Sequence, residues 1–317
     1  MMALGQHELS LLSLLATPGV GNVRASKILA WCSSKGKDVA DFVADPVPVK
    51  GVLSEDMATW LRSNKPAIHK TAQELSDAKI TLVTKGSENY PARLMSLLGD
   101  KAPLILFAKG KLANLDSIGV GFCGSRKASD KGLATAADCA DQLAQSGIDV
   151  VSGFAAGVDF QAHYASLKAG GTTTVVLAEG ILNFKIRRAL EPVWDWKNAL
   201  VLSEFHPNAG WSIGNAMQRN WSICALSRVM ILIEAQSKGG SAEAGKACMK
   251  LGLPLFASEY EGAPNSASGN RDLLNLGAER LLKSKTTGRA NLNRVLHFAR
   301  HSAGQTVAIA AQAYKSC

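Results

Sequence analysis

The pattern of apolar and polar residues changes near residue 80. Before that point, apolar side chains recur at helical spacing, as in the leucine-rich segment 9–15 and in residues 23–29. After it, apolar runs of a few residues, typical of buried strands, alternate with segments of helical period. The expected strands are residues 80–84, 104–108, 118–123, 149–152, 173–177, 200–203, 228–233 and 255–257. The expected helices between and after them are residues 130–146, 159–169, 214–226, 241–251 and 270–276.

This alternation predicts an α/β protein with a doubly wound, mostly parallel sheet, preceded by a small helical domain. We expect three regions: a helical domain of helix-hairpin-helix (SAM-like) type at 1–80, an α/β core at 81–283 and a basic tail at 284–317. In the first region, P-G-V-G at 18–21 separates two helical segments. Hairpins of this outline can offer backbone amides to phosphate groups, and many others only connect packed helices. The sequence leaves both roles open.

Charge narrows the class of partner. The 317-residue chain has a formal net charge of +9, and 47% of its residues are hydrophobic, which is ordinary for a globular protein. No Asp or Glu follows Glu279, whereas Lys285, Arg289, Arg294 and Arg300 do. A basic chain with such a tail favours a polyanionic partner such as nucleic acid.

Several other classes are not expected. The six cysteines contain no C-x-x-C pair, and neither metal-ligand spacing nor paired carboxylates are visible. No apolar run approaches the length of about 18 residues that crosses a bilayer, and the N-terminus lacks a basic segment leading into a long apolar one. We therefore expect a cytoplasmic protein with no membrane partner, no cofactor and no metal.

Three glycine loops each follow an expected strand and precede an expected helix. Their candidate phosphate-binding residues are Gly124, Ser125, Arg126, Lys127, Gly153, Gly157, Gly240 and Ser241. The carboxyl ends of adjacent parallel strands share one edge of a sheet, where helix N-termini and backbone N–H groups favour anions. Arg126 adds a planar guanidinium that suits phosphate. The loops therefore predict a phosphate site, although glycines that only permit tight turns give the same pattern.

Residues 119–124 also match G-x-G-x-x-G, the fingerprint of dinucleotide-binding folds. Here Ile118, Val120 and Phe122 alternate as strand residues, so two of the three glycines lie inside the strand. The acidic residue expected at the end of the second strand is also missing, and Ser152 stands there. We therefore do not expect NAD or FAD binding.

Five motifs follow one another along the core. They are G-S-R-K-A-S-D-K-G from Gly124, V-V-S-G-F-A-A-G-V-D-F-Q-A-H from Val150, L-S-E-F-H-P from Leu202, G-N-A-M-Q-R-N-W-S-I-C-A-L-S from Gly214 and S-G-N-R-D-L-L-N-L-G-A from Ser268. This succession resembles the DNA-processing protein A family (DprA, also called Smf) over roughly residues 86–283. The helical N-terminal domain with its hairpin is also similar to that family. The resemblance implies an extended Rossmann-like fold for the core.

The resemblance also implies a protein that binds single-stranded DNA and catalyses no reaction. Members of the family bind the strand in a basic pocket on the core, form homodimers through that core and load the RecA recombinase during natural transformation. The residues that match the family's loop motifs are Gly124, Ser125, Arg126, Gly153, Gly157, Asp159, Arg219 and Asn220. We expect Arg126 and Arg219 to clamp phosphates while loop amides add neutral donors, which fixes the strand without reading its sequence.

The chain departs from the family's pattern at three places. Ala156 and Trp221 stand where arginines are usual, and residues 239–245 replace S-G-S-L-x-T-A. Losing two arginines weakens phosphate binding by roughly 1.5–3 kcal/mol for each charged hydrogen bond. Trp221 either stacks on a base, which is worth about 1–3 kcal/mol, or packs within its helix. The sequence leaves both roles open.

Other functions remain as alternatives. Gly239-Gly240-Ser241-Ala242-Glu243 faintly resembles the catalytic loop of the cytokinin-activating phosphoribohydrolases, but Glu243 falls two positions early. A nucleotide sensor without hydrolysis, or a DprA-like protein specialised for defence against phage, would carry the same loops. For His163 we expect a packing role rather than catalysis.

Overall fold

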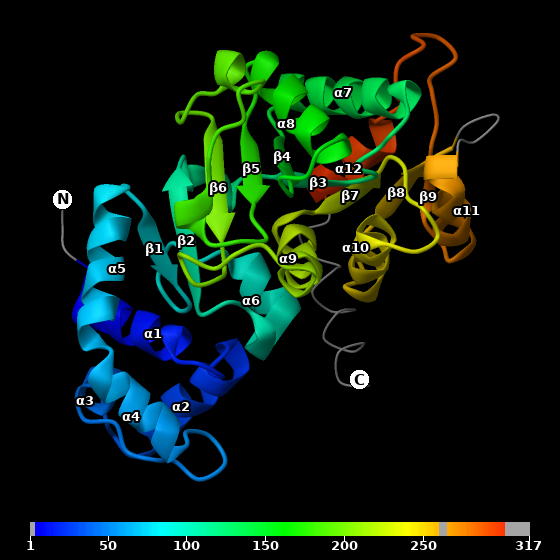
Figure 1. Cartoon of the computed structure of the whole chain (residues 1–317). Helices are drawn as coiled ribbons and strands as arrows, with labels where there is room; N and C mark the ends of the chain where they lie inside the picture. Colours follow the sequence, from blue (N-terminus) through cyan, green and yellow to red (C-terminus); the bar gives the residue numbers. More distant parts are fainter. Residues whose placement is uncertain (1–3, 260–264, 302–317) are drawn as a thin grey trace.

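The computed structural model describes residues 4–259 and 265–301, which form a helical part and an α/β part (Figure 1). The helical part consists of α1 (Gln6–Ala16), α2 (Asn22–Ser34), α3 (Val39–Ala44), α4 (Glu55–Ser63) and α5 (Lys65–Asp77). Leu14, Ile28 and Leu53 are buried at its centre, so these helices share an apolar core. The turn between α1 and α2 places Gly19 at a φ of 78°, a left-handed conformation that favours glycine.

One mixed sheet runs through the α/β part of the described residues. Its strands are β1 (Thr81–Thr84), β2 (Ile105–Gly110), β3 (Gly119–Cys123), β4 (Asp149–Ser152), β5 (Thr173–Val176), β6 (Ala199–Ser203), β7 (Val229–Leu232), β8 (Leu255–Ser258) and β9 (Glu279–Leu281). They lie in the order β1-β2-β6-β5-β4-β3-β7-β8-β9. All pairs from β6 to β9 are parallel, and β2 pairs antiparallel with both β1 and β6. The predicted α/β class with a mostly parallel sheet is confirmed.

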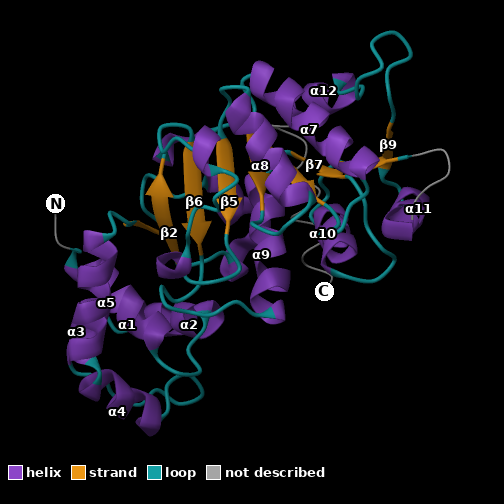
Figure 2. Cartoon of the chain, turned by 45° about the horizontal axis from the view of Figure 1, so that its top comes forward, coloured by secondary structure: helices purple, strands orange, loops and turns teal. Residues whose placement is uncertain are grey.

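Helices cover both faces of this sheet (Figure 2). On one face lie α7 (Asp130–Gln145), α8 (Val158–Lys168) and α12 (Asn293–His301); on the other lie α6 (Ala92–Leu98), α9 (Ile213–Leu226), α10 (Gly240–Lys250) and α11 (Ser268–Asn275). Short 3-10 helices occur at Gly99–Lys101, Leu112–Asp116, Ile181–Asn183, Glu191–Val193 and Asn265–Ala267. Because side chains alternate along β3, Phe122 packs in one layer and Cys123 in the other. Across the described ranges, every helix is too short or too polar to span a bilayer.

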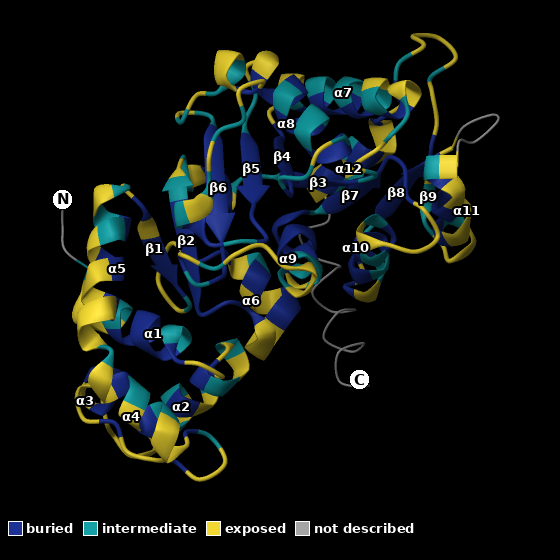
Figure 3. Ribbon diagram, in the orientation of Figure 1, coloured by how far each residue is buried: buried dark blue, intermediate teal, exposed yellow. Residues whose placement is uncertain are grey.

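The helical part packs directly on the sheet. Leu12 of α1 and Leu75 of α5 join Phe107, Val175 and Val201 in one buried cluster. Strands β3 to β8 are buried on both faces, whereas the outer sides of α4 and α5 are exposed (Figure 3). The contact between the two parts is therefore a continuation of the core.

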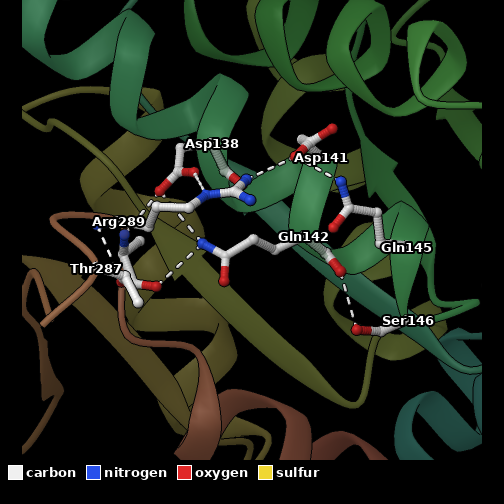
Figure 4. Close-up of polar contacts among 8 residues, drawn as sticks. Asp138, Asp141, Gln142, Gln145, Ser146, Thr287 and Arg289 are labelled. Atoms are coloured by element: carbon white, nitrogen blue, oxygen red, sulfur yellow. Dashed lines mark hydrogen bonds and ion pairs between the residues drawn. The ribbon is translucent and has the colours of Figure 1, made fainter.

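The segment after residue 283 is packed on the core as far as the structure describes it. The Arg289 guanidinium forms ion pairs with Asp138 (2.5 Å) and Asp141 (2.6 Å) of α7, and Gln142 donates to the Ala290 carbonyl at 3.0 Å (Figure 4). In α12, Val295 is fully buried. Up to residue 301, the region expected to form a basic tail is therefore a loop, residues 282–292, followed by α12. The apolar side of α12 packs on the sheet in the same layer as α7. Residues 302–317 of the expected tail lie outside the described residues.

Candidate phosphate site at the carboxyl edge of the sheet

The three glycine loops meet at the carboxyl ends of β4, β3 and β7, which are adjacent in the sheet. They surround a cavity of about 520 Å³, here called the strand-end cavity. Of the predicted site residues, the cavity is lined by Gly124, Ser125, Arg126, Lys127, Arg219, Asn220, Gly240 and Ser241. The loop pattern therefore brings together residues more than 110 positions apart in the chain, as parallel pairing requires.

Gly157 allows the first two loops to pack against each other. A Cβ atom at Gly157 would lie 2.3 Å from the Ser125 carbonyl oxygen, and the residue has a φ of 79°. The Val158 N–H donates to the same carbonyl oxygen at 3.3 Å, while Lys127 N–H donates to the Ser125 hydroxyl at 3.0 Å. Gly157 thus lies beneath the first loop and fixes its path, rather than facing the cavity.

The third glycine loop is hydrogen-bonded to the first loop and to α9. The Ser241 hydroxyl donates to the Gly124 carbonyl oxygen at 2.7 Å, and the Asn220 side-chain amide donates to the Gly240 carbonyl oxygen at 3.2 Å. These bonds hold the N-terminus of α10 against the first loop and against α9. N–H groups in the first turn of a helix have no intrahelical acceptor, so this end of the cavity favours an anion.

Arg219 of α9 contributes a buried cation to the cavity. Only 8% of its surface is exposed, and its Nη1 donates to the Asn220 side-chain oxygen at 3.3 Å. Within the described chain, its Nε has no hydrogen-bond partner. Burial lowers the pKa of this guanidinium; the Asp159 carboxylate opposes that shift and the Arg126 cation adds to it. A buried, incompletely satisfied cation is a strong receptor for a negatively charged group.

An aromatic side chain that sequence reasoning missed stands at the rim. The Trp211 ring lies 5.4 Å from the Arg126 guanidinium carbon, and 50% of the Trp211 surface is exposed. Both residues line the cavity, together with Ile213, which is 72% exposed. The available signal in the sequence was a tryptophan in the loop just before the helix that carries Arg219.

Two predicted features lie away from the cavity. Trp221, the candidate for base stacking, is half-buried on the other side of α9 and lines a different cavity. Ala156 is exposed at the tip of the second loop and is not among the lining residues. A stack on Trp221 would therefore require a base outside the strand-end cavity.

Glu243 and His163, the two residues considered for catalysis, do not line the strand-end cavity. Glu243 forms an exposed ion pair with Lys246 at 2.8 Å and does not line the cavity. His163 is fully buried, with Nδ1 2.6 Å from the Thr173 hydroxyl and Nε2 2.6 Å from the Gly153 carbonyl oxygen. Burial lowers the pKa of His163, which fits a packing role. In the described ranges, no three His, Cys, Asp or Glu side chains gather as a metal site would need.

The fold and cavity define the class: a doubly wound α/β protein with a basic cavity at the carboxyl edge of its sheet. The family model of DNA recombination-mediator protein A matches residues 81–290. The chain belongs to this family, and the resemblance to DprA and Smf proteins is confirmed.

Curated relatives are similar over much of the chain. Protein Smf of Synechocystis is 30% identical over 207 residues, which are 63% of this chain and 51% of that protein. DNA processing protein DprA of Bacillus subtilis is 27% identical over 242 residues, or 74% of this chain and 81% of the relative. Protein Smf of Escherichia coli is 31% identical over 244 residues, or 73% and 64%. The chain thus spans about half the length of the Synechocystis relative.

Solved structures agree on the fold. DNA processing protein A from Streptococcus pneumoniae aligns with a TM-score of 0.71 and 26% identity, over 88% of this chain and 95% of that one. DNA processing protein A from Helicobacter pylori, described as having a unique single-stranded DNA binding mode, aligns with a TM-score of 0.56 and 24% identity over 70% and 94%. Because the first of these aligns over 88% of this chain, the alignment extends beyond the α/β core into the helical part.

Proposed function

We propose that the protein binds single-stranded DNA without sequence preference, and that the strand-end cavity holds the DNA backbone. The observation that carries this proposal is Arg219, a buried guanidinium in the cavity lining beside the exposed Arg126, with an Nε that has no hydrogen-bond partner among the described residues. A phosphate would satisfy both cations at once, and the amides at the start of α10 would add neutral donors. Membership of a family of DNA recombination mediators supports DNA as the polyanion.

A single strand suits the rim better than a duplex. Trp211 presents an exposed ring beside Arg126, and a ring of this kind binds bases by stacking only where their faces are free. Bases in a duplex are stacked on one another, so their faces are covered. Backbone contacts and base stacking are both tolerant of sequence, which accounts for the absence of a preference in this proposal.

The proposal is tested by titrating a fluorescent oligo-dT with the protein at several salt concentrations. Arg126→Ala is expected to weaken binding about tenfold, from the loss of a charged hydrogen bond. It is also expected to reduce the slope of log affinity against log salt by about 0.7, the value for one phosphate contact on a single strand. Lys250→Ala removes one charge at the opposite end of α10 and serves as the control. Equal affinities and slopes for Arg126→Ala and wild type would contradict the proposal.

The finer parts of the function follow the family. In this proposal the protein is a cytoplasmic homodimer that hands the bound strand to a RecA-type recombinase during DNA processing, in natural transformation or alternatively in phage defence. Strand exchange by RecA on DNA precoated with single-strand-binding protein tests the handover. Faster exchange with wild type than with Arg126→Ala supports it, and equal rates argue against it.

We further propose that binding occurs without turnover, because Glu243 stands outside the cavity. Incubation with nucleoside monophosphates tests this point. Release of free base would instead support the phosphoribohydrolase alternative.

A further inference from the structure

A second and larger cavity lies between the helical part and the core. It has a volume of about 850 Å³ and is here called the interdomain cavity. One wall comes from the hairpin of α1 and α2, including Gly19, Arg24 and Lys27. The facing wall comes from the loop after β6 and from α9, including Glu204 and Trp221. The volume is within the range of small-ligand sites, about 300–1,000 Å³.

Helix α9 separates this cavity from the strand-end cavity. Gln218, Trp221 and Ser222 face the interdomain cavity, whereas Arg219 and Asn220 face the strand-end cavity. This division follows from helical geometry, because successive residues are turned by about 100°. With side chains, α9 is about 10 Å across, so an extended strand of more than a few nucleotides can pass around the helix and reach both cavities.

The two walls of the interdomain cavity offer different chemistry. Trp221 is half-buried and presents an aromatic surface beside the polar side chains of Gln218 and Glu204. The Glu204 carboxylate accepts a short hydrogen bond from the Ser222 hydroxyl, and burial raises the pKa of Glu204. Opposite them, Arg24 and Lys27 lie one turn apart on α2 and supply positive charge.

These walls are held in place before any ligand binds. The Leu104 N–H of the core donates to the Asn22 side-chain oxygen at 3.1 Å, which anchors the start of α2. Arg24 donates to the Gly19 carbonyl oxygen at 2.6 Å, so its side chain folds over the hairpin. A preformed cavity with an aromatic wall and a facing cationic wall matches a nucleotide, which carries a flat base at one end and a phosphate at the other.

We propose that the interdomain cavity binds a second nucleotide of the same DNA strand, with its base against Trp221 and its phosphate near Arg24 and Lys27. This inference rests on the proposed function of the strand-end cavity. A strand, rather than a free nucleotide, is favoured because both cavities share α9 as a wall and lie within the reach of one chain. The helical part then acts as a preformed clamp on DNA that is also held by the core.

The test compares oligo-dT of about 4 and about 16 nucleotides, which span the usual site sizes of single-strand-binding folds. Lys27→Glu changes an exposed side chain and leaves the buried core intact. It is expected to weaken binding of the longer oligonucleotide about tenfold and to leave the shorter one unchanged. Trp221→Ala is expected to act in the same way, by loss of a stacked base. Lys37→Glu, exposed in the same helical part but outside the cavity, is the matched control.

The outcomes separate this inference from the function on which it rests. Loss of affinity confined to the longer oligonucleotide supports the clamp. No loss, or equal loss at both lengths, overturns it. Binding of dTMP that depends on Trp221, with the longer oligonucleotide unaffected by Lys27→Glu, also overturns it, because the ligand would then be a free nucleotide. If Arg126→Ala fails to weaken either length, the proposed function fails; if only the length dependence is missing, the clamp alone fails.

Discussion

The guanidinium of Arg219 occupies the space that a side chain at residue 153 would need. A Cβ atom at Gly153 would lie 2.2 Å from Nη1 of Arg219 and 2.4 Å from its central carbon. Gly153 does not line the strand-end cavity, yet its lack of a side chain leaves the space in which the buried Arg219 guanidinium lies. Gly153, which the sequence analysis assigned to phosphate binding, therefore lies behind the Arg219 guanidinium rather than in the cavity lining.

Gly153→Ala is expected to displace the Arg219 guanidinium and to weaken oligo-dT binding about tenfold, with a smaller effect on thermal stability. The reason is that the clash involves the end of a flexible side chain rather than backbone. Paired titration and thermal unfolding measurements check this expectation. Gly210→Ala is a suitable control, because open space surrounds that position and its φ is not left-handed. Unchanged DNA affinity in Gly153→Ala would show that the position of the Arg219 guanidinium does not affect DNA binding.

Much of the site's outline could be predicted from the sequence. Short runs rich in β-branched residues, such as 173–177, indicated buried strands, and β5 spans Thr173–Val176. Parallel strands bring their carboxyl ends to one edge, so glycine loops after three strands were expected to meet, and they do. These features depend on local pattern and on a general rule of topology.

Other features depend on contacts that no local pattern encodes. Arg219 and Trp221 are two residues apart and therefore face different sides of α9, but the sequence alone does not say which side meets the phosphate loops. Trp211 approaches Arg126 across 85 positions of chain. Strand β9 has three residues and only one buried side chain, so it gave no clear period. The segment after 283 was assigned to a basic tail because the sequence indicated one amphipathic stretch there, about residues 292–300, but not that this stretch packs on the sheet as α12.

Asp149 gives the fold a pH dependence that the variant Asp149→Asn tests. Burial raises the pKa of this carboxyl to about 7, against hydrogen bonds from Thr174 and Thr172 that lower it. The folded state therefore holds a proton that the unfolded state releases near pH 4. The stabilising contribution is complete below about pH 4 and is lost as pH rises through about 7.

Between about pH 4 and pH 7, the free energy of unfolding of wild type is therefore expected to fall by on the order of 3 kcal/mol through this carboxyl. Asp149→Asn should show no such fall, because it has no group that titrates at this position. Denaturant unfolding at graded pH measures the difference between the two. The exposed Asp116→Asn should keep the profile of wild type. Parallel profiles for wild type and Asp149→Asn would show that the carboxyl is ionised in the folded protein.

Arg289 is expected to contribute to stability but not to DNA binding. Its two ion pairs with Asp138 and Asp141 hold the loop before α12 against α7, although 41% of its side chain is exposed. Arg289→Ala should therefore cost only about 1 kcal/mol, and the cost should shrink at high salt. Arg294→Ala, whose ion pair with Glu279 is more exposed, should cost less. A marked loss of oligo-dT affinity in Arg289→Ala, at unchanged stability, would show that the basic segment after residue 283 contributes to DNA binding.

Trp211 and Arg126 are expected to bind the same DNA strand through different interactions, Trp211 by stacking on a base and Arg126 by contacting a phosphate. Trp211→Ala removes an exposed ring, so stability should change little, while loss of one stacked base should weaken oligo-dT binding about tenfold. Because stacking releases no counterions, the slope of affinity against salt should stay that of wild type, in contrast to Arg126→Ala. Trp211→Phe keeps an aromatic face and should recover most of the affinity. A change of slope in Trp211→Ala would mean that the ring serves mainly to position the Arg126 guanidinium, 5.4 Å away.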